Sequence, residues 1–96
     1  MNKKQPSILT NDMEHCIICG RSPVAWHHVI NGTANRKKSD VFGLIIPLCS
    51  KHHDMIHDDQ RLDIIWKKRA ELKFIDLYGA EMWMETFHKN YLDEVI

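Results

Sequence analysis

One short stretch of the chain concentrates side chains that bind metal ions. Residues 47–57 read Pro-Leu-Cys-Ser-Lys-His-His-Asp-Met-Ile-His, with the possible ligands Cys49, His52, His53 and His57. If residues 50–58 form a helix, His53 and His57 lie one turn apart and can offer two imidazoles to one ion. Cys49 and His52 are three residues apart and point toward a different metal. We therefore expect one short helix to serve two metal sites.

A second pair of thiols lies upstream. Cys16 and Cys19 are separated by two residues, and Gly20 permits a tight turn after them. The chain has three cysteines, so a complete set of disulfides is impossible and metal binding outranks oxidation. The alternative is that Cys16 and Cys19 are buried free cysteines, but a second pair of possible ligands, Cys49 and His52, follows further along the chain. We expect these four residues to bind a structural zinc ion.

His27 and His28 lie in residues 24–30, a short segment that is typical of a β-strand. Because adjacent residues of a strand face opposite sides, the two histidines cannot do the same job unless a bulge intervenes. One can face a metal while the other faces a substrate or the interior. An isolated pair would more simply be one core and one surface histidine. The presence of His53 and His57 favours the metal-binding interpretation.

Three consecutive cations, Arg36, Lys37 and Lys38, lie in residues 32–40, which we expect to form a loop. A solvated charge run is the usual explanation of such a triplet. Its place between two strands that flank a metal site supports contact with phosphate groups equally well. Residues 41–48 are nearly all apolar, which predicts a second strand covered on both faces.

The apolar periodicity changes after residue 58. Apolar residues at four-residue spacing predict an amphipathic helix that ends near Gly79. The buried stripe of this helix would consist of Leu62, Trp66, Ala70, Phe74 and Tyr78, widened by Ile65, Leu72 and Leu77. Residues 80–92 indicate a second helix that carries Trp83, Phe87 and Tyr91. We expect both helices to cover the metal-binding unit, with the aromatic residues in the core.

The composition describes one small domain. The 96 residues are 44% hydrophobic, and a core of this size is often stapled by structural zinc. We expect residues 1–14 to form a flexible arm and residues 15–96 a single domain, with a metal-binding core in 15–58 and a helical part in 59–96.

The balance of charge limits how the chain can bind a polyanion. The 13 basic and 13 acidic side chains cancel, so binding must depend on local patches and bound metal. No apolar stretch reaches the roughly 18 residues of a membrane helix, and the N-terminus lacks an apolar signal core. We therefore expect no membrane partner and a cytoplasmic location.

The spacing of four motifs resembles the HNH endonucleases, and more narrowly the small phage-type nucleases with HH, SD and PLCxxHHxxxH signatures. The motifs are Cys16-x-x-Cys19, His27-His28-Val29, Ser39-Asp40 and Pro47-Leu48-Cys49-x-x-His52-His53-x-x-x-His57. The resemblance covers residues 16–57. It departs from the usual pattern at Leu44, where the middle asparagine of the HNH motif is expected, and Asp40 is the substitute.

The resemblance implies an α+β fold, in which a zinc-stapled ββα-metal, treble-clef-like finger is followed by two covering helices. His28 would be the general base, and the ligands of a catalytic divalent cation would be His27, His53 and His57. Asp40 would orient His28 or contribute to the metal site. The implied partner is DNA, with double-stranded DNA favoured, and the implied source is a phage or prophage acting in the bacterial cytoplasm.

The chemistry of phosphodiester hydrolysis agrees with this set of residues. Imidazole, with an ordinary pKa near 6.5, can take a proton from water, and a divalent ion can stabilise the phosphate and the leaving oxygen. Three imidazoles suit Zn²⁺, Ni²⁺, Co²⁺ or Mn²⁺ better than Mg²⁺, which prefers oxygen ligands. To cut both strands, so small a domain would act as a homodimer or by sequential nicking.

Two other classes of protein compete with the nuclease. A zinc module that binds nucleic acid or protein without cutting would use the cysteine-containing site, but it has no need of four further histidines. A zinc hydrolase or deaminase acting on a small substrate would require a His-x-Glu motif, which the chain lacks.

Overall fold

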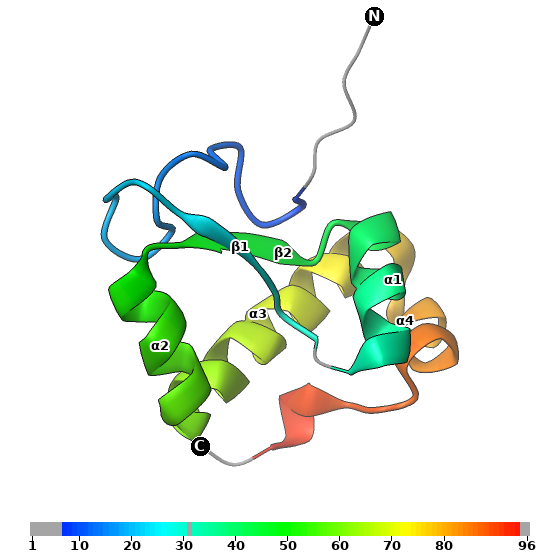
Figure 1. Cartoon of the computed structure of the whole chain (residues 1–96). Coiled ribbons are helices and arrows are strands. Elements are labelled where there is room, and N and C mark those ends of the chain that lie inside the picture. The colour runs from blue at the N-terminus through cyan, green and yellow to red at the C-terminus, as the bar shows by residue number, and fades with distance from the viewer. Residues whose placement is uncertain (1–6, 31, 95–96) are drawn as a thin grey trace, which may run out of the picture.

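A two-stranded antiparallel sheet lies between helices of an α+β fold (Figure 1). The computed structural model describes residues 7–30 and 32–94. The elements are β1 (Ala25–His28), α1 (Thr33–Phe42), β2 (Ile45–Leu48), α2 (Ser50–Asp58), α3 (Gln60–Tyr78), α4 (Ala80–Phe87) and the 3₁₀ turn η1 (Tyr91–Asp93). Among the described helices, none is long and apolar enough to cross a membrane.

The two strands lie side by side along their whole length. The register pairs Ala25 with Leu48 at one end and His28 with Ile45 at the other. All four residues of β2 are buried, as the apolar run predicted. Figure 1 shows α2 at one end of the sheet and α1 at the other, with α3 running past both.

Helix α1 corrects the expectation of a loop over residues 32–40. It spans Thr33–Phe42, so the order is strand, helix, strand, helix, and Val41 and Phe42 end α1 rather than begin β2. Gly43 ends the helix in the left-handed conformation (φ 73°), which glycine adopts without a side-chain clash, and its N–H donates to the Ser39 carbonyl. The turn after Gly43 leads directly into β2.

The C-terminal helices supply most of the large core side chains. Trp66, Ala70 and Phe74 of α3 are buried, as the four-residue spacing predicted, and so are the aromatic side chains Trp83, Phe87 and Tyr91. The helix expected over residues 80–92 instead ends at Phe87, and η1 follows.

Two leucines of α3 were assigned to the wrong face. Leu72 is 57% exposed and Leu77 is 50% exposed, so the buried stripe is narrower than the sequence indicated. For Leu72 the reason is helical phase: at about 100° per residue it lies nearly opposite both Ala70 and Phe74, which carry the buried stripe.

The N-terminal segment packs against the sheet unit over the residues that are described. Ser7 is 1% exposed, the Ile8 N–H donates to the Gly43 carbonyl at 2.9 Å, and Met13 is buried. Residues 7–13 of the expected arm therefore contact the sheet unit, and residues 1–6 lie outside the described part.

Candidate metal centres and the adjacent cleft

The first cluster of ligands brings together Cys16, Cys19, Cys49 and His52, whose ligand atoms all lie within 4.8 Å of one another. The Cys19 and Cys49 Sγ atoms are 3.7 Å apart, and the His52 Nδ1 atom lies 3.3 Å from the Cys49 Sγ. A zinc tetrahedron with Zn–S bonds of about 2.3 Å separates two sulfur atoms by about 3.8 Å. The cluster therefore has the size and donor set of a structural zinc site.

A tight backbone turn positions the first two thiols. The Cys16 N–H donates to the Arg21 carbonyl and the Gly20 N–H donates to the Cys16 carbonyl, both at 2.8 Å. Gly20 has φ +78°, a conformation that side chains rarely adopt. The Ile17 N–H donates to the Pro47 carbonyl at 2.9 Å and so fastens the turn beside the last strand residues before Cys49.

The electrostatics of the thiols favour a bound cation. Burial acts to raise the pKa of Cys16, but the backbone N–H groups of Cys49, Cys19 and Ile18 lower it to about 6. The Arg21 N–H acts to lower the pKa of Cys19, but burial and the neighbouring thiols raise it overall. Because ionised thiols repel one another at this separation, a positive ion among them would stabilise their thiolate forms.

The second cluster consists of His27, His53 and His57, again with ligand atoms within 4.8 Å of one another. The His53 and His57 Nε2 atoms are 3.3 Å apart, and both rings lie edge-on to the His27 ring at 5.4 Å between centroids. His27 is 6% exposed, and its buried Nε2 atom has no hydrogen-bond partner among the described residues. An unpartnered buried nitrogen is costly, and a metal ion would satisfy it.

The protonation state of His27 suits a metal ligand. Burial, followed by the nearby His53 and His57, lowers its pKa to about 4. The imidazole is therefore neutral at pH 7, and a neutral imidazole is the form that donates a lone pair to a metal ion.

Helix α2 contributes ligands to both clusters, as the spacing predicted. Cys49 is its N-cap residue, and His52 in the first turn faces the thiols. The next residue, His53, faces His27 together with His57.

His28 lies outside both clusters and is paired with Asp40. Its Nε2 atom is 2.8 Å from the Asp40 Oδ1 atom. Because a carboxylate accepts hydrogen bonds, Nε2 is the donor in this pair, and in the neutral form of the ring Nδ1 carries the lone pair. Asp40 lies beside His28 and is not a member of the three-histidine cluster.

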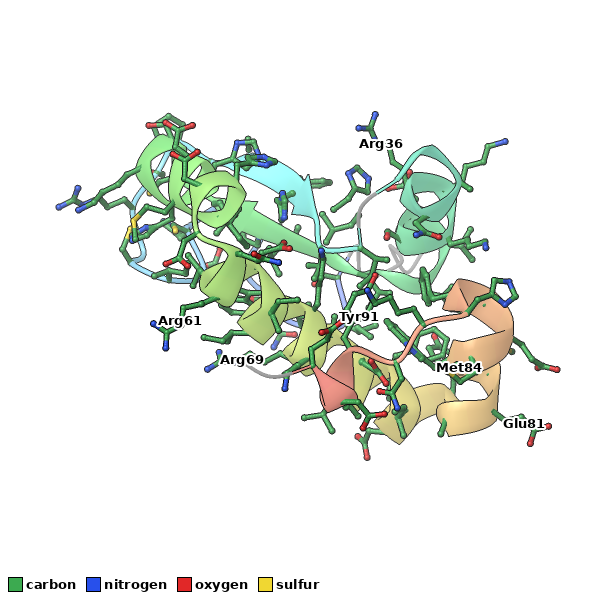
Figure 2. The ribbon with its side chains drawn as sticks, turned by 90° about the horizontal axis from the view of Figure 1, so that it is seen from below. Arg36, Arg61, Arg69, Glu81, Met84 and Tyr91 are labelled. Carbon is green, nitrogen blue, oxygen red and sulfur yellow. The ribbon has the colours of Figure 1, made fainter. Side chains whose placement is uncertain are left out.

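Helix α1 is the element that brings Asp40 to this position, and it also separates the three cations. Arg36 lines a cleft of about 550 Å³ together with five residues of the site: Trp26, His27, His28, His53 and His57. Figure 2 shows Arg36 projecting from the start of α1, well apart from Arg61 and Arg69. The Lys38 ammonium instead donates to the Thr86 carbonyl of α4 at 2.7 Å. The triplet is therefore not one continuous patch.

Trp26 was missed as a site residue. Its side chain lines the cleft and is 53% exposed, although the sequence marked it only as an apolar neighbour of His27. The available signal was its position next to His27: adjacent residues of a strand face opposite sides of the sheet, so a buried His27 predicts an outward-facing Trp26.

The fold and the two clusters define a small α+β protein with two groups of side chains that could hold a metal ion, both of which include residues of one short helix. Residues 11–74 match the model of a family described as a protein of unknown function (DUF968), and the chain belongs to this family. Neither a curated protein nor a solved structure matches the chain.

Proposed function

We propose that the chain is a metal-dependent endonuclease of the HNH type that hydrolyses phosphodiester bonds of DNA. One observation carries the proposal: three histidines at metal-binding distance, His28 and Arg36 all line the same cleft, and His28 is hydrogen-bonded to Asp40. The spacing of the cysteine and histidine motifs supports the same class.

In this proposal His27, His53 and His57 hold a catalytic divalent ion. The all-nitrogen donor set suits Zn²⁺, Mn²⁺, Ni²⁺ or Co²⁺, with Mg²⁺ less well matched. When bound, such an ion supplies Lewis-acid stabilisation of charge on the phosphate and on the leaving oxygen. The unpartnered Nε2 atom of His27 is the observation that fits this role best.

His28 acts as the general base through its free Nδ1 atom. Asp40 holds the ring by the 2.8 Å contact to Nε2 and fixes which nitrogen is free. Arg36 contacts a phosphate of the bound strand from the start of α1. The cysteine-containing cluster has four ligands and so leaves no position for substrate, and its role is to staple the fold.

The test is cleavage of supercoiled plasmid by protein that holds one structural zinc per chain and has been depleted of other metal. Each divalent ion is then restored separately. Nicked plasmid is the expected product, and its absence with every one of the five ions would overturn the proposal.

A matched control exists in the chain. His15 and Asp12 form a second pair at 2.8 Å, exposed and outside the cleft. His15→Ala should cut like the parent, while His28→Ala should lose cleavage.

A further inference from the structure

Trp26 presents a large aromatic surface to solvent inside the cleft. It is 53% exposed, whereas Trp66 is 7% exposed and Trp83 is fully buried. Its Nε1–H donates to the Met13 carbonyl at 3.0 Å, which holds one edge of the ring against the N-terminal segment. The ring is therefore held in place while much of its surface stays free.

The position of Trp26 relates it directly to His28. The two residues are two apart on β1, so their side chains emerge from the same face of the strand, about 7 Å apart along it. His27, between them, points the other way into the three-histidine cluster. A group stacked on Trp26 would therefore lie next to whatever His28 contacts.

The charge of the cleft shows that phosphate contacts alone are a weak source of affinity here. Arg36 is the one lysine or arginine among the described residues that line it, and the whole chain carries 13 basic and 13 acidic side chains. Duplex DNA is held mainly through many phosphate contacts. Single strands are also held by bases that stack on aromatic side chains, because every base has an exposed face once it is unpaired.

We propose that Trp26 stacks on an unpaired nucleobase beside the phosphate at His28, so that the cleft takes single-stranded DNA in preference to duplex. In a duplex the bases stack on one another and offer no face to the indole. This inference rests on the proposed function and refines its substrate, replacing the duplex expected from the resemblance.

The test measures binding in the zinc-loaded His28→Ala protein, which prevents cutting during the titration. The probes are an oligothymidylate of about 12 nucleotides and a duplex of equal length. We expect the single strand to bind more tightly and to quench tryptophan fluorescence, because the other two indoles are buried. Trp26→Leu should weaken single-strand binding by about 5- to 150-fold and leave duplex binding unchanged.

Two further variants separate stacking from a structural role. Trp26→Phe and Trp26→Leu both lose the hydrogen bond to Met13, but only the leucine variant loses the ring, so the phenylalanine variant should keep most of the affinity. Tyr78→Leu makes the same kind of change at a half-exposed ring outside the cleft and should leave binding unaltered. Melting temperature and zinc content are measured for each variant.

Equal binding of single strand and duplex, or equal losses in the phenylalanine and leucine variants, would overturn the inference. Failure of the proposed function is a different result. In that case Trp26-dependent quenching by the single strand persists in a protein that cuts neither plasmid nor single-stranded DNA with any metal.

Discussion

At the scale of single residues, His27 and His28 have opposite surroundings although they are neighbours in sequence. His27 is buried against His53 and His57, and His28 meets Asp40 at the edge of the cleft. The alternation of a strand is enough to separate a ligand from a base. The different roles proposed for His27 and His28 therefore depend on the opposite faces of β1 from which their side chains emerge.

His28→Ala should lower cleavage by about 10²- to 10⁴-fold, the usual value of a positioned base, and leave metal content unchanged. His27→Ala should instead weaken metal binding, so part of its activity should return at high metal concentration. Plasmid cleavage and metal content, measured on both variants, separate the two roles. Loss of the catalytic ion in His28→Ala but not in His27→Ala would reverse the assignment.

Cys49→Ala should release the structural zinc and unfold most of the domain. Cys49 is buried, and its Sγ atom lies 3.7 Å from the Cys19 Sγ atom. It is also the N-cap residue of α2, the helix that contributes ligands to both clusters. Its loss therefore disturbs the cysteine-containing cluster and the start of this helix. Because zinc binding to such a site is also folding free energy, the loss should be large. Zinc stoichiometry and thermal unfolding measure it. An unchanged melting temperature with zinc retained would contradict the assignment.

At the scale of elements, α1 was the part of the fold that the sequence did not predict. Its residues 33–42 bury little apolar surface, with Ser39 buried and Phe42 half-buried, so no stripe marks a helix. The cations and Asp40 are equally typical of a loop. The left-handed Gly43 was the signal available, since it is a common residue just after a helix.

The other elements were predictable because their patterns are set by burial or by ligand spacing. The apolar run of β2 predicts a buried strand, the ligand spacing of α2 predicts a helix, and the four-residue stripe of α3 predicts an amphipathic helix. The pairing of Asp40 with His28 could not be read in the same way, because it requires the helical phase of α1 and the register of β1 at once.

Two cations of α1 should now behave differently. Arg36→Ala should weaken DNA binding and lower its salt slope by about 1, because Arg36 lines the cleft. Lys38→Ala should leave binding unchanged and lower the free energy of unfolding by about 0.5–1.5 kcal/mol, because its ammonium joins α1 to the Thr86 carbonyl of α4. Salt-dependent binding and denaturant unfolding measure the two effects. Identical behaviour of both variants would mean that the triplet acts as one patch.

Glu71 joins α3 to the C-terminal turn η1 and should make stability depend on pH. Its carboxylate is 2% exposed and accepts a hydrogen bond from the Tyr91 N–H at 2.6 Å. Burial raises its pKa above the ordinary 4.5, against the opposing effect of the Tyr91 and Leu92 N–H groups. The folded protein therefore binds the proton more tightly than the unfolded chain. The resulting stability is present below pH 4.5 and is lost as the pH rises through the folded pKa.

Glu71→Gln should remove this loss, because glutamine can still accept from the Tyr91 N–H but does not ionise. As the pH rises from about 4 to 7, the free energy of unfolding of the variant should increase relative to that of the parent. Denaturant unfolding across this range measures the difference, with the exposed Glu85→Gln as the control. A constant difference between Glu71→Gln and the parent would show that the carboxyl has the same pKa in both states.

At the scale of the whole molecule, the thiol cluster (Cys16, Cys19, Cys49 and His52) and the C-terminal helices stabilise different parts of the fold. The thiol cluster fastens the turn at Cys16 to the start of α2, and α3 and α4 supply the aromatic core that β2 rests on. Figure 2 shows Tyr91 of η1 close to α3, where it closes the core from the C-terminal end.

The last prediction follows from the number of three-histidine clusters. The described part of the chain holds a single cluster of three histidines, so one chain should cut one phosphodiester per binding event. A supercoiled plasmid should therefore become an open circle first, and linear DNA should follow only after a second, independent cut or through a dimer. Gel analysis over time, repeated across protein concentrations, distinguishes these routes. Independent cuts form linear DNA only after a lag in which the open circle accumulates, whereas a dimer forms it without that lag and at an initial rate that rises more steeply than the protein concentration. Linear DNA formed from the outset, at a rate proportional to protein and without an open circle, would require a second cutting centre in the same chain.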